Sequence, residues 1–281
     1  MSQRSFLQID VFTDTPYRGN PLAVVVDGEG LSSDEMQQFA NWTNLSETAF
    51  LLAPTNPAAD YRVRIFTPTV ELPFAGHPTL GSCHAWLASG GIPQDPAMVV
   101  QECGAGLVRV RRSAEGLAFA APALRRSGQV DDALVGRVAT ILGLDRSDIV
   151  DSQWVDNGPG WVAVMLRDAE AVLAVRPGFV DDLDIGVVGL YPAGSPFAYE
   201  VRGFFAKDGN TVEDPVTGSL NASVAQWLLG TQRVAAPYTA SQGTVLGRAG
   251  RVRIECEGVG DDTDVWVGGR CVTCIAGTVE L

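Results

Sequence analysis

Two stretches of the sequence decide the fold: PTLGSCHAWLAS at residues 78–89 and PVTGSLNASVAQWLL at residues 215–229. Each is small or apolar around nearly its whole circumference and contains no charged residue. A helix without a polar face is buried on all sides. Short stretches with the alternating pattern of strands precede and follow both helices in the sequence. The sequence therefore predicts an α+β fold of two pseudo-symmetric lobes, each a curled, mostly antiparallel sheet around a central buried helix.

The two halves of the chain repeat the same order of elements. Strands lead into a loop with Pro at the helix start, and the buried helix then carries a Trp-Leu pair, Trp86-Leu87 in one half and Trp227-Leu228 in the other. The stretch APALRRSGQ at residues 121–129 is typical of a linker. We expect an N-terminal lobe at 1–120 and a C-terminal lobe at 121–281, with the alternative that the last strands return to the first lobe.

Composition and charge exclude several classes of partner. The chain has 281 residues with 33 acidic and 20 basic side chains, a net charge of −13. Such a chain has no basic stripe for phosphates, so nucleic acid is not an expected partner. No apolar run approaches the roughly 20 residues that span a bilayer, and the N-terminus reaches Asp10 too early for a signal peptide. Five irregularly spaced cysteines indicate reduced thiols. We expect a cytoplasmic protein without a membrane partner.

The sequence carries no recognised motif for a cofactor or a metal. It contains no GxxxxGK[ST] loop, no GxGxxG after the first strand and no HExxH. Cys271 and Cys274 lie in a predicted strand, where residues three apart face opposite sides of the sheet. His77 and His84 are separated by about 10 Å of helix, too far to share one metal. We therefore expect no cofactor and no metal, and we interpret His84 as a packed core histidine.

Three places offer groups that could perform chemistry. The helix starts in AGHPT, which contains His77, and in EDPVTGS, which contains Asp214, present free backbone N–H groups suited to an anion. The alternative is that Pro with a preceding Asp or Thr only caps each helix. Glu47 lies beside the apolar run Thr48–Leu52, where partial burial would raise its pKa toward the range useful for general acid–base catalysis. A solvated carboxylate at a strand end is the alternative for Glu47.

Five segments together resemble a known family. In order, they are FxQxDVFTxxPxxGNPLAVV, NLSETAFL, PFAGHPTLG, RGFFA and EDPVTGS, and they extend from Phe6 toward the final strands. This combination is similar to the phenazine-biosynthesis (PhzF-like) isomerases. The resemblance implies the diaminopimelate-epimerase fold with the active site between the lobes, and a homodimer. It also implies a cofactor-independent isomerase that moves a proton on a small carboxylate-bearing substrate, as in the isomerisation of dihydro-hydroxyanthranilate.

The resemblance also implies residue roles. Glu47 falls on the family's proton-transferring carboxylate. Neither helix start carries the cysteine of the two-thiol epimerases of this fold, so racemisation by two thiols is excluded. An epimerase or lyase that uses the same carboxylate, or a non-catalytic protein that binds small acids, are the alternatives. Five further residues at the two helix starts would contact the substrate: Gly76, His77, Asp214, Gly218 and Ser219.

Overall fold

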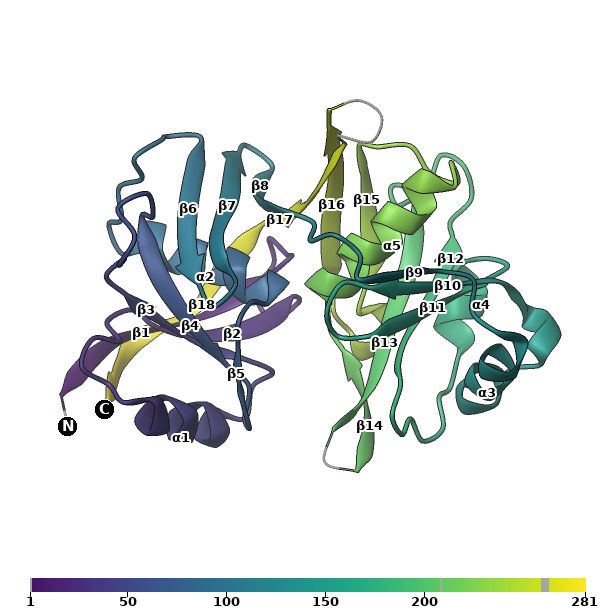
Figure 1. Ribbon diagram of the computed structural model, residues 1–281, viewed down its shortest axis with the longest axis horizontal. Coiled ribbons are helices and arrows are strands. Elements are labelled where there is room, and N and C mark those ends of the chain that lie inside the picture. The colour runs from purple at the N-terminus through teal and green to yellow at the C-terminus, as the bar shows by residue number, and fades with distance from the viewer. Residues whose placement is uncertain (1, 208, 259–262) are drawn as a thin grey trace. The chain divides into compact units, whose positions relative to one another are not determined.

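The chain divides into two compact units in the computed structural model, which describes residues 2–207, 209–258 and 263–281 (Figure 1). The first unit is Met1–Ala120 with Gly268–Leu281, and the second is Ala121–Val267. Each unit combines many strands with a few helices, so the predicted α+β class is confirmed. None of the helices in the described ranges is long and apolar enough to cross a membrane.

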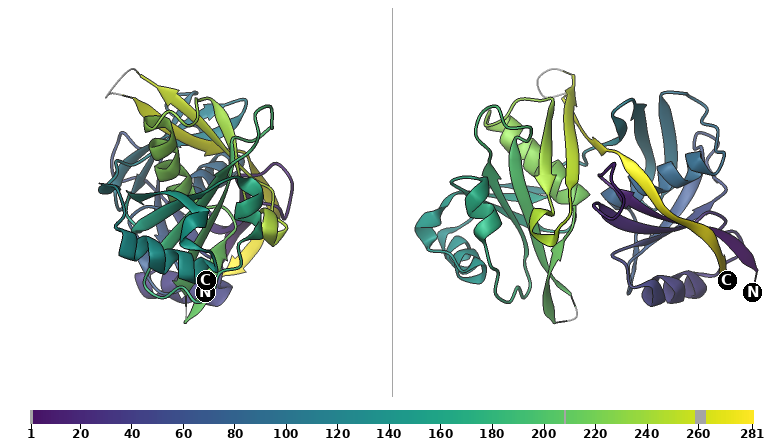
Figure 2. Two further views of the ribbon diagram at one scale, coloured as in Figure 1. Left: turned by 90° about the vertical axis from the view of Figure 1, so that its right-hand side faces the viewer. Right: turned by 180° about the vertical axis from the view of Figure 1, so that it is seen from behind.

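The first unit is a mixed sheet with two helices. β1 lies between β18 and β2 and is antiparallel to both, so the two ends of the chain lie side by side (Figure 2). β2 and β3 are parallel, and the pairs β3–β4, β6–β7 and β7–β8 are antiparallel. The elements are β1 (Gln3–Val11), β2 (Asn20–Val25), α1 (Ser33–Thr43), β3 (Thr48–Leu52), β4 (Tyr61–Phe66), β5 (Glu71–Leu72), α2 (Gly76–Ala88), β6 (Met98–Cys103), β7 (Gly106–Ser113), β8 (Gly116–Ala120) and β18 (Cys271–Glu280).

Helix α2 is the buried helix of the first unit, and it packs against β1, β2 and β8. Its small residues permit close contact: a Cβ on Gly81 would lie 2.5 Å from the Leu22 side chain. Thr79 of this helix is hydrogen-bonded inside the unit. Tyr61 donates to Gln101 (2.8 Å), and the Gln101 amide donates to the Thr79 hydroxyl (3.1 Å). The absence of a polar face on this helix therefore predicted its burial correctly.

Helix α1 covers a separate apolar cluster of the first unit. A capping box starts this helix, because the Glu35 N–H donates to the Ser32 hydroxyl and the Ser32 N–H donates to the Glu35 carboxylate. Met36 and Phe39 of the helix pack against Phe50 of the sheet. This packing fixes where the chain leaves α1 and enters β3, the connection that contains Glu47.

The second unit has a sheet covered by three helices. β11 and β12 are parallel, β12 and β13 are antiparallel, and β13 also pairs in parallel with β15. The elements are β9 (Arg126–Gly128), α3 (Asp132–Leu142), a 3₁₀ turn (Arg146–Asp148), β10 (Ile149–Asp156), β11 (Trp161–Leu166), α4 (Ala169–Ala174), β12 (Asp184–Leu190), β13 (Tyr199–Lys207), β14 (Asn210–Asp214), α5 (Gly218–Gly230), β15 (Tyr238–Gln242), a 3₁₀ turn (Thr244–Leu246), β16 (Gly250–Glu257) and β17 (Asp264–Gly269), whose last two residues belong to the first unit.

Helix α5 is the buried helix of the second unit. Leu220 enters the sheet where two strands carry glycine: a Cβ on Gly186 would lie 2.5 Å from this leucine, and one on Gly203 would lie 3.1 Å from it. Helices α3 and α4 contribute Val138 and Val172 to another apolar cluster of the same unit. The buried helix thus packs closely against glycines of its own sheet. Its burial confirms the prediction made from its lack of charged residues.

The starts of both buried helices differ from the prediction. Helix α2 begins at Gly76, two residues before Pro78. Pro78 fits in the first turn of the helix, because the N–H groups of that turn have no partner within the helix. Helix α5 begins at Gly218, three residues after Pro215, so this Pro lies outside the helix. The side chain of Thr217 is hydrogen-bonded to residues outside the helix, and such bonds compete with helix formation.

Candidate active site

Glu47 lies in the short connection between α1 and β3. Helix α1 ends at Thr43, and Asn44 turns the chain in the left-handed region with φ of 54°, a conformation that Asn tolerates. β3 then begins at Thr48, beside β2. The Glu47 side chain is only 16% exposed. The carboxylate is therefore held near the surface of the first unit but is largely removed from water.

His77 is the second residue of α2, and its side chain faces Glu47. The His77 Nε2 atom lies 3.4 Å from Glu47 Oε2, and both atoms are inaccessible to solvent. The imidazole is 6% exposed. The sequence separates these residues by thirty positions, and the fold joins them within one unit.

Burial determines the charge of His77. Desolvation lowers the pKa of this imidazole from 6.5 to about 3, although a hydrogen bond with the Pro21 backbone acts in the opposite direction. The positive end of the α2 dipole also disfavours the imidazolium. His77 is therefore neutral at neutral pH, and its contact with Glu47 is not an ordinary ion pair.

Two contacts at the imidazole favour different tautomers. The Asn20 amide nitrogen lies 3.5 Å from His77 Nδ1, and its N–H would donate to an unprotonated Nδ1. The bond with Pro21 raises the pKa and so uses a ring N–H as the donor to the backbone. In one tautomer Nε2 donates to a Glu47 carboxylate, and in the other Nε2 accepts from a Glu47 carboxylic acid. The two arrangements differ by one proton in total, because the first places a neutral imidazole beside a carboxylate and the second places it beside a carboxylic acid.

Asp214 ends β14 in the second unit and does not cap the following helix. The Thr217 hydroxyl donates to Asp214 Oδ2 (2.7 Å), and the N-cap residue of α5 is Thr217 itself, without a side-chain capping bond. The alternative that Asp214 only caps this helix is therefore wrong. This hydrogen bond between Thr217 and Asp214 closes a turn immediately before α5.

Gln242 holds this turn from the neighbouring strand β15. The amide is fully buried and makes four hydrogen bonds. Its oxygen accepts from the Thr217 N–H and from Asn221, and its nitrogen donates to the Asp214 carbonyl and the Thr217 hydroxyl. The sequence analysis missed Gln242, because a single Gln in a predicted strand carries no signal of its partners.

Gly218 and Ser219 form the first turn of α5. Gly218 is buried, and the Ser219 hydroxyl accepts a hydrogen bond from the Trp161 indole (3.0 Å). Asn157 donates to the Ser219 carbonyl (2.9 Å). The start of β11 and the loop before it thus fix the serine, and neither Asn157 nor Trp161 was identified from the sequence.

The predicted site residues fall into two groups. Glu47, Gly76 and His77 gather in the first unit, and Asp214, Gly218 and Ser219 gather in the second. His84 belongs to neither group. It is half-buried and hydrogen-bonded to Thr273 (3.0 Å), so the interpretation as a packed core histidine is wrong.

The described residues contain no cluster of three or more His, Cys, Asp or Glu side chains that could hold a metal ion. Cys271 and Cys274 both lie on β18, as the strand pattern predicted.

The sequence and the fold both match known proteins. Residues 9–277 match a family described as phenazine biosynthesis-like protein. Antisense-enhancing sequence 1 of Schizosaccharomyces pombe is 37% identical over 99% of this chain and 99% of its own length. The trans-2,3-dihydro-3-hydroxyanthranilate isomerase of Pseudomonas chlororaphis is 32% identical over 98% of this chain and 99% of its own length. The crystal structure of a Bacillus anthracis PhzF-family protein has the same fold, with a TM-score of 0.85, 22% identity and full coverage of both chains.

Proposed function

This chain belongs to the phenazine biosynthesis-like family, a family of isomerases, and we propose that it moves a proton on a small carboxylate-bearing substrate without a cofactor or metal. The similarity to a trans-2,3-dihydro-3-hydroxyanthranilate isomerase supports that compound, or a similar small unsaturated acid, as the first trial substrate. The proposal assigns the chemistry to Glu47, with His77 as its partner.

The single observation that carries the proposal is the contact between Glu47 and neutral His77. In the first step, the Glu47 carboxylate takes a proton from a substrate carbon: the C–H bond breaks, an O–H bond forms and the double bond shifts. In the second step, the same proton passes to a different carbon, which restores the carboxylate. His77 orients the carboxylate, because its Nε2 lies 3.4 Å from Oε2.

Substrate binding is assigned to the two helix starts. The backbone N–H groups near Gly76 and near Gly218 and Ser219 would hold anionic oxygens, because the first turn of a helix leaves such donors without intrahelical partners. Asp214 would orient the substrate. These roles follow the family resemblance, and the hydrogen bonds of Asp214 and Ser219 support them, since they fix both side chains in place.

Deuterium exchange tests the proposed reaction and its alternatives. The protein, treated with EDTA, is incubated in D₂O with trans-2,3-dihydro-3-hydroxyanthranilate and with other small unsaturated acids, and NMR follows the carbons. An isomerase gives a shifted double bond, with deuterium wherever the proton exchanges with solvent. An epimerase exchanges and inverts one carbon, a lyase releases an elimination product, and a binding protein is stabilised by the acid without any reaction. Activity that EDTA abolishes and a divalent ion restores would overturn the metal-free mechanism.

We also propose that the protein is cytoplasmic, because its five irregularly spaced cysteines indicate reduced thiols, and that it is a homodimer, on the family resemblance alone. Light scattering of the purified protein tests the assembly. A monomeric mass would contradict the proposed dimer and would leave the proposed reaction unaffected.

A further inference from the structure

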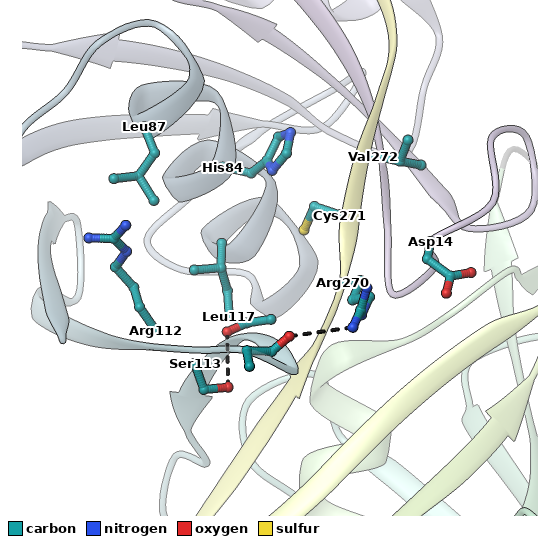
Figure 3. Close-up of a pocket in the computed structure, with 11 residues that line it drawn as sticks. Asp14, His84, Leu87, Arg112, Ser113, Leu117, Arg270, Cys271 and Val272 are labelled. Atoms are coloured by element: carbon teal, nitrogen blue, oxygen red, sulfur yellow. Dashed lines mark hydrogen bonds between the residues drawn. The ribbon is translucent and has the colours of Figure 1, made fainter. Parts of the chain in front are cut away.

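The first unit contains a cavity of about 450 Å³ that none of the candidate active-site residues lines (Figure 3). Helix α2 contributes His84, and the β7–β8 hairpin contributes Arg112 and Leu117. Arg270 comes from the segment before β18, and Asp14 comes from the loop between β1 and β2. The volume lies within the range of about 300–1,000 Å³ that is usual for small-molecule sites.

The walls of the cavity are held together by specific backbone contacts. Gly116 has φ of +130°, and a Cβ at this position would lie 2.3 Å from the Gly269 carbonyl oxygen. Only glycine permits this approach of the hairpin to the chain before β18. The Arg270 guanidinium donates to the Ala114 carbonyl (3.4 Å), and the Thr13 N–H donates to the Arg270 carbonyl (3.0 Å). The hairpin, the segment before β18 and the Asp14 loop thus form one connected frame.

The cavity is positive in a chain whose net charge is −13. Within the described residues, Arg112 and Arg270 have no carboxylate partner. Arg112 donates to the Pro96 carbonyl (3.0 Å) and Arg270 to the Ala114 carbonyl. A neutral carbonyl leaves the charge of a guanidinium uncompensated, and each guanidinium has five N–H donors. Asp14, on an exposed loop, offsets one of the two charges, so the cavity keeps an excess positive charge.

Other lining groups add no negative charge and provide an apolar wall. Burial raises the pKa of the Cys271 thiol to about 12, so this thiol stays protonated at neutral pH. Leu87, Leu117 and Val272 line the same cavity, and Figure 3 shows Leu117 and the Cys271 sulfur directed toward its interior. The cavity therefore combines two cationic groups with an apolar surface.

We propose that this cavity is a second binding site, for a small organic anion in which a carboxylate or phosphate group is attached to an apolar body. Arg112 and Arg270, which Figure 3 draws on opposite sides of Leu117, supply the positive charge that attracts the anionic group, and Leu87 and Leu117 contact the apolar body. This site is independent of the reaction proposed at Glu47.

Calorimetric titration of the full chain tests the proposal with three probes: benzoate, its neutral analogue benzamide, and inorganic phosphate. Benzoate is expected to bind. Benzamide and phosphate should bind at least several-fold more weakly, because benzamide lacks the negative charge and phosphate lacks the apolar body. The variants Arg112→Gln and Arg270→Gln should each weaken benzoate binding several-fold, because each removes one of the two positive charges, and the double variant should weaken it roughly tenfold or more. A phenyl phosphate arm identifies which anionic group is preferred.

Arg146→Gln in the second unit is the matched control, because it also removes one partly exposed arginine and should leave benzoate binding unchanged. Thermal unfolding of each variant confirms that it is folded. Equal benzoate affinity in the wild type and the folded Arg112→Gln/Arg270→Gln double variant would overturn the proposal. Equal affinity for benzamide, or for inorganic phosphate, would overturn the assigned ligand class.

Discussion

Helices α2 and α5 are similar in construction and differ in the chemistry at their starts. Both are thirteen residues long, begin with Gly and are buried in their own unit. At α2, the helix itself carries a titratable residue, His77, which faces Glu47. At α5, the carboxylate of Asp214 lies before the helix and is bonded to Thr217.

The comparison shows that the start of a buried helix can carry different chemistry in the two units. At α2, the Glu47 carboxyl lies beside a neutral imidazole, so it can take up or release a proton without breaking an ion pair. The network at α5 leaves the amide of Gln242 fully hydrogen-bonded and holds Asp214 in one arrangement. We infer that the first helix start is suited to proton transfer and the second to positioning.

The largest effect is expected from Glu47→Gln, which keeps the shape of the side chain and removes its ability to transfer a proton. Turnover should fall by roughly 10²–10⁴-fold, the usual contribution of a positioned acid or base. Ligand binding and folding should stay within a few-fold of the wild type. Steady-state kinetics and a thermal-shift titration measure both. Full turnover in this variant would show that the first helix start does not perform the chemistry.

The second prediction concerns acid stability of the first unit. The pKa of His77 is about 3 when folded and 6.5 ordinarily, so below pH 6.5 the unfolded chain binds more protons. The free energy of unfolding therefore falls as the pH falls through this window, by as much as about 5 kcal/mol at its lower end. Urea unfolding of wild type and His77→Asn, at about pH 7.5 and pH 4.5, measures this difference.

His84→Asn is the matched control, because His84 is only half-buried and hydrogen-bonded. Its effect on acid stability should have the same sign and be smaller, since burial lowers its pKa too. Identical pH dependence in the wild type and His77→Asn would contradict a neutral, buried His77.

The third prediction concerns the positioning network of the second unit. Gln242→Met keeps the length of the side chain and removes all four hydrogen bonds of the amide. The free energy of unfolding should fall by about 2–4 kcal/mol, because buried donors and acceptors lose their partners. Chemical denaturation measures it, with the exposed Gln38→Met as a control. A loss below about 0.5 kcal/mol, the usual range of surface substitutions, would show that Gln242 does not hold the turn.

The smallest effect is expected at Asp184, a partly buried residue of the second unit. Burial, followed by repulsion from Asp156, raises the pKa of Asp184 from 3.8 to about 6. The protonated Asp184 therefore costs no stability below pH 3.8, and the free energy of unfolding falls as the pH rises from 3.8 through 6. This pH dependence is opposite in sign to that of His77. Asp184→Asn should raise the free energy of unfolding by about 1–3 kcal/mol at pH 8 and leave it unchanged near pH 3.

Asp132→Asn, which alters an exposed aspartate of the same unit, is the control for this measurement. No gain in stability at pH 8 for Asp184→Asn would contradict the raised pKa. The two pH experiments together separate the units by the sign of their response.

Much of the fold could be predicted from the sequence, because burial leaves a direct pattern in the residues of a helix. The uncharged stretches that became α2 and α5 predicted two buried helices. The first residues of the buried helices could not be predicted as well. Helix α5 starts late because Thr217 is bonded to Gln242, a residue twenty-five positions away.

The candidate site could be predicted only where a motif marked it. Glu47 and His77 were identified separately, and their contact depends on the packing of α2 beside β3. Asn157, Trp161 and Gln242 gave no signal, because their roles come from partners that are distant in the sequence. His84 was misinterpreted, since a helix that is apolar in sequence can still line a cavity at one position.

The most direct test compares Glu47→Gln with Asp214→Asn in one deuterium-exchange experiment on a substrate of the wild-type protein. We expect Glu47→Gln to bind the substrate and to lose exchange at the substrate carbon. Asp214→Asn, which keeps an acceptor for Thr217, should exchange the same carbon at a reduced rate. Full exchange in Glu47→Gln together with none in Asp214→Asn would show that Glu47 does not transfer the proton and would assign this role to Asp214.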